Sequence, residues 1–255
     1  MINKTLIRNN FSKCAPYYDR YSSIQNLSAA RLITKIKDNR LKRILEIGSG
    51  TGNYTRLLRE RFPQARIKAL DISPQMCRIA EEKFRQNSIE FIVTDAEEAT
   101  FKEKFDLISS NASLQWFDDL ETSLTRYREL LVEDGMISFS IFGPQTFWEL
   151  NQALRELSAA SLSIDAYGFI EKKKIEKILK KLFRDVKIER KLYQEESINT
   201  FELLKKIKYT GVRGEALNRK GLWTAKMLKS LEKIYRQKSK TVVATYEVFF
   251  CKGIK

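Results

Sequence analysis

The stretch RILEIGSGTG, residues 43–52, decides the fold of this chain. Its first five residues form a short apolar run that predicts a buried strand, and glycines follow at once at positions 48, 50 and 52. Glycines are needed where a chain turns sharply and where a ligand lies against bare backbone. A strand that runs into a glycine turn and then a helix is the first unit of a parallel sheet, and ligands bind such sheets at the carboxyl ends of the strands.

Strand and helix patterns alternate on both sides of this stretch. Apolar residues at helical spacing predict helices over residues 24–36, 54–62, 74–84 and 120–131. Short apolar runs predict strands over residues 43–47, 67–70, 90–93, 105–108 and 136–142. Five strands separated by helices predict an α/β fold, a parallel sheet wound on both faces.

The regular alternation of predicted strands and helices ends at residues 143–144, Gly-Pro. Beyond them we expect helices over 146–160 and 171–182, a strand over 186–190, a helical and basic stretch over 195–240, and a last strand over 242–250. Strand pairs of this kind are common at the end of a parallel sheet. The expected fold is therefore a doubly wound, mostly parallel, seven-stranded Rossmann-like sheet with a helical cap.

The domain organisation is predicted to be simple, because the chain has no internal repeat and no low-complexity linker. We expect one domain over residues 1–255. It divides into N-terminal helices (1–40), a core (41–143), a basic and mostly helical cap with one strand (144–240) and the last strand (241–255).

The composition excludes several kinds of chemistry. The sequence contains no histidine, which removes the commonest general base and the usual zinc sites, so no metal is expected. Cys14, Cys77 and Cys251 lack the spacing of a disulfide framework, which indicates buried free thiols in a reducing compartment. No run of about 18 apolar residues occurs, and residues 1–10 are polar rather than signal-like. We therefore expect a cytoplasmic protein.

The positive charge is confined to one part of the chain. Residues 1–150 carry 22 Lys and Arg against 20 Asp and Glu, whereas residues 151–255 carry 25 against 12. The second part thus holds +13 of the net charge of +15. Such an excess favours an anionic partner, although a solvated, lysine-rich surface would give the same count.

Two acidic residues follow the second and third predicted strands, where a nucleoside would need them. Asp71 ends the second strand and can accept hydrogen bonds from both ribose hydroxyls, and Asp95 ends the third. Taken singly, each could be an ordinary strand-end cap. The dinucleotide fingerprint would require glycine at position 53, which is asparagine here. The pattern of glycines 48, 50 and 52 with Glu46 before them instead resembles the class I S-adenosylmethionine (SAM)-dependent methyltransferases.

This resemblance implies SAM as the cofactor and a specific set of contacts. A carboxylate at Asp95 would take the adenine amino group, the backbone of Ala96 would take the ring, and apolar residues would flank it. The implied cofactor-binding residues are Glu46, Gly48, Ser49, Gly50, Gly52, Asp71, Ile72, Met76, Asp95, Ala96 and Asn111.

The loop after the fourth strand bears on the methyl acceptor. Residues 109–116 lack the Asn/Asp-Pro-Pro-aromatic motif of amino-directed methyltransferases. They are similar to the Ser-Asn-x-x-x-Gln-Trp loop of the malonyl-acyl-carrier-protein O-methyltransferases of biotin synthesis, and trans-aconitate methyltransferases share a close version. Segments at 11–25, 142–150, 204–211 and 245–249 also resemble the biotin family. The resemblance implies substrate contacts from Tyr18, Gln25, Gln115, Trp116 and Thr146.

The implied reaction is methylation of the free carboxylate of a malonyl thioester. A carboxylate with a pKa of about 4 is ionised at neutral pH and needs no general base, so a histidine-free enzyme can perform this step. The resemblance also implies an acidic acyl carrier protein as partner, which the basic cap would suit. A small-molecule carboxylate methyltransferase and an RNA methyltransferase are the alternatives, since basic surfaces also follow phosphates.

Overall fold

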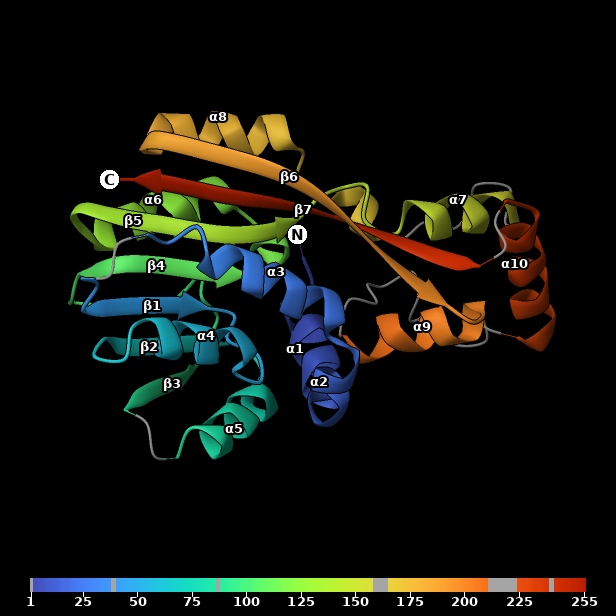
Figure 1. Cartoon of the computed structure of the whole chain (residues 1–255), viewed down its shortest axis with the longest axis horizontal. Helices are drawn as coiled ribbons and strands as arrows, with labels where there is room; N and C mark the ends of the chain where they lie inside the picture. Colours follow the sequence, from blue (N-terminus) through green and yellow to red (C-terminus); the bar gives the residue numbers. More distant parts are fainter. Residues whose placement is uncertain (1, 38–39, 86–87, 158–164, 211–223, 239–240) are drawn as a thin grey trace.

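The computed structural model describes residues 2–37, 40–85, 88–157, 165–210, 224–238 and 241–255. Its centre is one seven-stranded sheet in the order β3-β2-β1-β4-β5-β7-β6 (Figure 1). The strands are β1 (Arg43–Ile47), β2 (Arg66–Asp71), β3 (Ile89–Val93), β4 (Phe105–Asn111), β5 (Leu131–Phe142), β6 (Arg184–Ser197) and β7 (Val242–Ile254). The first five strands pair in parallel, and β7 is antiparallel to both β5 and β6. The predicted fold class is confirmed.

Helices cover both faces of the sheet. On one face Ile44 of β1 packs in a core with Leu32 of α3 (Ser23–Ile33) and Leu58 of α4 (Asn53–Arg61). The other core combines Leu45, the next residue of β1, with residues of α6 (Leu120–Leu130) and α8 (Lys172–Leu182). Successive strand residues point to opposite faces, and a strand buried on both sides is therefore apolar throughout.

The N-terminal helices run over the carboxyl ends of the parallel strands. They are α1 (Lys4–Cys14), η1 (Ala15–Tyr17), α2 (Tyr18–Tyr21) and α3. The side chain of Asn3 caps α1 by accepting a hydrogen bond from the Leu6 N–H at 2.9 Å. Helix α1 packs against α5 (Pro74–Lys83), which follows β2. The strand order reverses between β1 and β4, so these helices lie over the edge where open α/β sheets bind ligands.

The last two strands are much longer than predicted, and they extend the sheet to α7 (Trp148–Leu157), α9 (Thr200–Tyr209) and α10 (Ala225–Lys238) (Figure 1). The expectation of helix from residue 195 is wrong at its start, because residues 195–197 belong to β6. The reason is that β6 is an edge strand whose exposed positions carry charges, a pattern that sequence alone does not separate from a polar helix. Residues 211–223 lie outside the described part of the chain.

Smaller differences have local causes. Helix α7 begins at Trp148 rather than at residue 146, because Phe147 adopts a positive φ of 59° that ends the preceding turn. All three cysteines are buried free thiols, as expected. Within the residues that the structure describes, no helix has the length and apolar character to cross a membrane.

Candidate cofactor and substrate site

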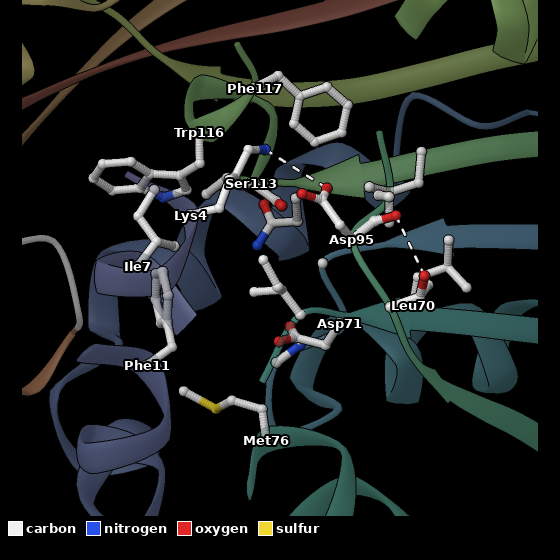
Figure 2. Close-up of a pocket in the computed structure, with 18 of the residues that line it drawn as sticks. Lys4, Ile7, Phe11, Leu70, Asp71, Met76, Asp95, Ser113, Trp116 and Phe117 are labelled. Carbon is white, nitrogen blue, oxygen red and sulfur yellow. Dashed lines mark hydrogen bonds and ion pairs between the residues drawn. The ribbon is translucent and has the colours of Figure 1, made fainter. Parts of the chain in front are cut away.

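A pocket opens at the carboxyl ends of β1, β2, β3 and β4, under helix α1 (Figure 2). The space between its atoms amounts to about 670 Å³, which includes solvent at its open mouth. The predicted site residues that line it are Tyr18, Gly48, Gly50, Asp71, Ile72, Met76, Asp95, Ala96, Asn111 and Trp116. These residues come from five separate stretches of the chain, and the fold brings them to one hollow.

The glycine turn is built for close approach of the backbone. Gly48 has a φ of 72°, and a Cβ there would lie 2.2 Å from the Oγ of Ser113 on the loop after β4. Gly50 has a φ of 55°, and a Cβ there would lie 4.0 Å from the ring of Tyr18. Gly52 lines no part of the pocket, since a Cβ there would meet the ring of Phe84 beside α5 at 2.7 Å. The missing side chain of Gly48 therefore makes room for Ser113 and that of Gly52 for Phe84, whereas only Gly50 has room left beside its backbone at the pocket.

Asp71 joins the glycine turn to the start of α5. One carboxyl oxygen accepts from the N–H of Gly50 and the other from the N–H of Ser73, both at 2.8 Å. Burial raises the pKa of Asp71 to about 6, although both backbone hydrogen bonds oppose that shift. Each oxygen can accept a further hydrogen bond, so a pair of vicinal hydroxyls would find two acceptors here.

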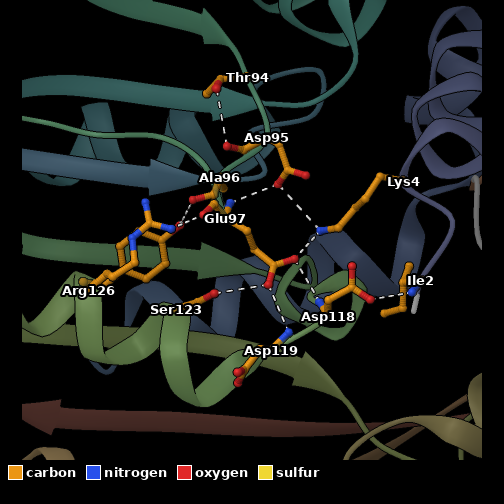
Figure 3. Close-up of polar contacts among 11 residues, drawn as sticks. Ile2, Lys4, Thr94, Asp95, Ala96, Glu97, Asp118, Asp119, Ser123 and Arg126 are labelled. Carbon is orange, nitrogen blue, oxygen red and sulfur yellow. Dashed lines mark hydrogen bonds and ion pairs between the residues drawn. The ribbon is translucent and has the colours of Figure 1, made fainter.

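A cluster of acidic side chains, centred on Asp95 and Glu97, lies at the end of β3 (Figure 3). Asp95 accepts from the N–H of Glu97 at 2.9 Å, and the Lys4 ammonium lies 3.6 Å from the same carboxyl oxygen. Lys4 also bonds to Glu97 at 2.5 Å. The first turn of α1 is thus tied by its charge to the loop that would hold an adenine ring.

Glu97 is the centre of this group. Its two carboxyl oxygens accept from the backbone N–H groups of Asp118 at 2.9 Å and Asp119 at 3.0 Å, besides Lys4. Burial opposes ionisation, yet the hydrogen bonds from Lys4 and the two amides hold the pKa of Glu97 below its usual range. An ionised Glu97 therefore fixes the segment that carries Phe117, a wall residue of the pocket.

Aromatic rings form the wall opposite the carboxylates. Phe11 of α1 meets Trp116 edge to face with ring centroids 6.3 Å apart, and Tyr18 with centroids 6.5 Å apart. The indole N–H of Trp116 is buried and has no hydrogen-bond partner among the described residues. Burial raises the pKa of Tyr18 well above its usual range, and nearby Cys14 and Asp71 add to the effect, so its phenol stays protonated. Both groups can donate hydrogen bonds to an acceptor in the pocket.

Helix α2 is anchored to the glycine turn next to this wall. Asp19 accepts hydrogen bonds from the Thr51 hydroxyl at 2.5 Å and from the Lys83 ammonium at 2.6 Å. Lys83 donates in addition to the carbonyl of Thr51 at 2.9 Å. These contacts hold Tyr18, the neighbour of Asp19, against the pocket.

Asn111 and Gln25 act together, although only Asn111 lines the pocket. The Asn111 amide donates to the backbone carbonyl of Gln25 at 3.0 Å, and its oxygen accepts from the Ser140 hydroxyl at 2.7 Å. Gln25 therefore supports the site through its backbone, and its own side chain is buried elsewhere. Asn111 is fixed on both sides and presents a rigid wall.

The remaining predicted residues do not line the pocket. Glu46 is fully buried on the α4 side of the sheet, and this burial raises its pKa to about 8. Ser49 is buried within the turn. Gln115 lines a neighbouring groove and donates to the Ala112 carbonyl at 2.7 Å. The Thr146 hydroxyl bonds to the backbone of Glu247 on β7 at 3.2 and 3.3 Å, which gives it a structural contact.

Several lining residues were not among the predicted ones, namely Lys4, Ile7, Phe11, Ile47, Leu70, Thr94, Ala112, Ser113 and Phe117. Three of them belong to α1. This helix lies far in sequence from the strands of the core, so the sequence gives no sign that it packs over the pocket. Glu97 could have been found from its place two residues after Asp95, at the same strand end.

Comparisons with known proteins agree with this geometry. The sequence model described as "Methyltransferase domain" matches residues 44–135. A malonyl-[acyl-carrier protein] O-methyltransferase of Ilyobacter polytropus is 35% identical over 93% of this chain and 88% of its own length. Another so named, from Acetivibrio thermocellus, is 34% identical over 98% of this chain and 93% of its own. This chain belongs to the malonyl-[acyl-carrier protein] O-methyltransferase family.

Solved structures show the same fold for this methyltransferase. A putative methyltransferase of Bacillus halodurans matches with a TM-score of 0.61 at 14% identity, over 90% of this chain and 99% of that one. The phosphoethanolamine N-methyltransferase 2 of Haemonchus contortus, solved with S-adenosyl-L-methionine, matches with a TM-score of 0.58 at 19% identity, over 93% of this chain and 56% of that one. The predictions of a methyltransferase and of SAM as its cofactor are confirmed.

The described pocket fits that cofactor. The methyltransferase offers open backbone at Gly50, two free acceptor positions on the Asp71 carboxylate, and apolar side chains of Ile72 and Met76 in the same lining as Asp95. A nucleoside with two ribose hydroxyls, a flat ring and an exocyclic amino group needs groups of these kinds.

Proposed function

We propose that this chain transfers the methyl group of SAM to the free carboxylate of a malonyl thioester carried by an acidic acyl carrier protein. One observation carries the proposal. The two carboxylates of the cofactor side, Asp71 and Asp95, and the acceptor wall of Asn111 and Trp116 line a single pocket. The names of the related proteins give the substrate class.

The contacts proposed for the cofactor follow from the lining. Asp71 would accept from the ribose hydroxyls, Asp95 and the backbone of Ala96 would hold the adenine edge, and Gly48 and Gly50 would face the amino-acid part. Bound SAM supplies an activated methyl group on a positively charged sulfur. The contribution of the chain is to hold that methyl toward the wall formed by Trp116 and Tyr18.

The transfer itself needs no proton movement. A carboxylate oxygen forms a bond to the methyl carbon while the carbon–sulfur bond breaks, and the electron pair stays on sulfur. The malonyl carboxylate is ionised at neutral pH, with a pKa of about 4. The protein contributes by aligning the reacting atoms and excluding water, which can supply up to about 7–11 kcal/mol in favourable cases. The phenol of Tyr18 and the unpartnered indole N–H of Trp116 are the donors proposed to orient the acceptor.

A methyl-transfer assay tests the proposal directly. Labelled SAM is offered with malonyl-carrier protein, malonyl-CoA, trans-aconitate or bulk RNA as separate acceptors. The proposal predicts a base-labile methyl ester on malonyl-carrier protein. Transfer to trans-aconitate alone would show a small-molecule enzyme, and transfer to RNA alone would show that the carboxylate acceptor is wrong.

The chemical step is expected to be independent of pH. With both substrates prebound, the single-turnover rate of methyl transfer should stay constant from about pH 6 to pH 8, because the acceptor is already an anion. Rapid-quench measurements at saturating SAM check this. A rate that climbs about tenfold per pH unit would show that a proton must be removed, which a carboxylate acceptor does not require.

SAM binding, by contrast, is expected to depend on pH. The Asp71 carboxyl, with a pKa of about 6, loses an acceptor position when it is protonated. Hydroxyl donors stabilise the ionised form, so SAM affinity should be constant above about pH 7 and fall progressively as the pH drops through 6. Calorimetry on the wild type and on Asp71→Asn checks this, because the asparagine variant cannot titrate. Equal slopes in the two proteins would assign the dependence to another group.

A further inference from the structure

A cluster of tyrosines and cations lies where α2 meets α9, beside the pocket. We call it the tyrosine face. Tyr17, Arg20, Tyr21, Lys208 and Tyr209 belong to it through ring and cation–π contacts, and the exposed Lys205 belongs to it by its place on α9 one turn before Tyr209. Helices α2 and α9 are in contact although some 180 residues separate them in sequence. Figure 1 shows α9 beside the N-terminal helices.

The rings hold the two helices together. Tyr209 stacks on Tyr21 with centroids 5.0 Å apart and planes 17° from parallel. Its other neighbour is Tyr17, at 4.9 Å and 55°. Tyr17 remains 52% exposed, so the cluster presents an aromatic surface to solvent as well as an internal contact.

The cations of this face have no acidic partner in the part of the chain that the structure describes. Arg20 lies 5.7 Å from the Tyr21 ring and Lys208 lies 5.4 Å from the Tyr209 ring, both as cation–π contacts. Among the described residues, neither of them nor Lys205 makes an ion pair, and all three are exposed. Lys206, on the other side of α9, pairs with Glu195 and Glu202. The tyrosine face therefore keeps positive charge that no acidic side chain of the described residues neutralises.

An apolar side chain continues the face along α9. Phe201 is 63% exposed, and it stands one and two turns before Lys205 and Lys208, on the same side of the helix. An exposed aromatic ring beside unpaired cations is typical of a protein-binding surface, where aromatic residues and arginine are enriched.

The face adjoins the pocket wall. Tyr209 packs against the small cluster of Cys14, Ala15 and Met76, and Met76 lines the pocket. Tyr17 precedes Tyr18, which lines it too. A molecule seated on the tyrosine face is thus separated from the pocket only by the residues that form its wall.

We propose that the tyrosine face is the docking surface for the acidic carrier protein. This inference rests on the proposed function. A thioester arm must reach the pocket from a carrier bound outside it, and the tyrosine face is a positive surface that adjoins the pocket wall. Unpaired cations would steer an acidic partner, and Phe201 and Tyr17 would be buried against it.

The larger basic cluster of the chain lies elsewhere. Helix α8 carries six lysines, but it packs on α6 and β6, and Figure 1 shows it at the far border of the sheet from α2 and α9. Part of its charge is also paired, since Lys180 contacts Glu176 and Lys181 contacts Glu121. The number of lysines alone would favour α8 as the docking surface, whereas the position next to the pocket wall favours α9.

Two charge-reversal sets of equal size test the proposal. One is Arg20→Glu, Lys205→Glu and Lys208→Glu, and the matched control on α8 is Lys173→Glu, Lys177→Glu and Lys180→Glu. We expect the first set to lower kcat/KM for malonyl-carrier protein by about tenfold or more, mainly through KM, and to reduce its salt dependence. The control set should alter kcat/KM for malonyl-carrier protein by less than about twofold. The first set should alter kcat/KM for malonyl-pantetheine, which has no carrier protein, by equally little.

Each other outcome has a definite meaning. If the first set changes nothing, or if the control set shows the loss, the docking face is wrong. Equal loss on malonyl-pantetheine would mean a damaged site rather than lost docking, and SAM affinity then identifies misfolding. In that case the milder pair Lys205→Gln and Lys208→Gln decides, with about threefold loss expected on the carrier substrate alone. A wild-type enzyme that methylates no malonyl thioester would overturn the proposed function itself.

Discussion

Asp71→Ala is expected to weaken SAM binding by at least tenfold, which corresponds to about 1.4 kcal/mol. The carboxylate has one free acceptor position on each oxygen for the ribose, and its other positions hold the N–H groups of Gly50 and Ser73 at 2.8 Å. The substitution therefore removes charge-assisted hydrogen bonds to the ligand and also releases the glycine turn. Isothermal calorimetry of the folded variant measures the effect.

Asp106 provides a matched control for this experiment. It also accepts from two backbone N–H groups, those of Lys42 and Arg43 at 2.9 and 2.8 Å, but at the amino-terminal edge of the sheet. Asp106→Ala should cost stability and leave SAM affinity within about twofold of wild type. Unchanged affinity in a folded Asp71→Ala protein would remove Asp71 from the site.

Glu97→Ala is expected to have the second large effect, because one side chain serves α1 and the loop after β4 together. The variant leaves the Lys4 ammonium and the amides of Asp118 and Asp119 without their acceptor (Figure 3). Loss of hydrogen bonds to a charged group predicts a decrease of about 2 kcal/mol in the free energy of unfolding. SAM release should also become faster, because α1 and Phe117 both cover the pocket.

Lys4→Met separates these two consequences. It removes the tie between α1 and the end of the pocket proposed to hold adenine, and it keeps the amide contacts of Glu97. We expect faster SAM release in stopped-flow experiments with a loss of stability below about 1 kcal/mol in urea titrations. If Lys4→Met releases SAM at the wild-type rate, α1 does not control the exit of the cofactor, and the effect of Glu97→Ala lies in the loop after β4.

The sequence by itself determined the core of this protein. Residues 43–47 form a strand and residues 48–52 a glycine turn, as the apolar run and the glycines at positions 48, 50 and 52 predict. Asp71 and Asp95 could be assigned to one edge because parallel strands place all their carboxyl ends together. The cofactor side of the pocket was predictable for that reason.

The tertiary structure alone decided what covers that core. Lys4 meets Glu97 across 93 residues, and Tyr209 meets Tyr21 across a still longer separation, and no local pattern encodes such pairs. The direction in which the predicted substrate-binding side chains point could not be derived from the sequence either. Thr146 bonds to β7, Gln25 supports Asn111 through its carbonyl, and Gln115 faces a neighbouring groove. Local backbone preferences are set by neighbours along the chain, whereas the walls of this pocket are set by which helices pack together, and packing depends on the whole fold.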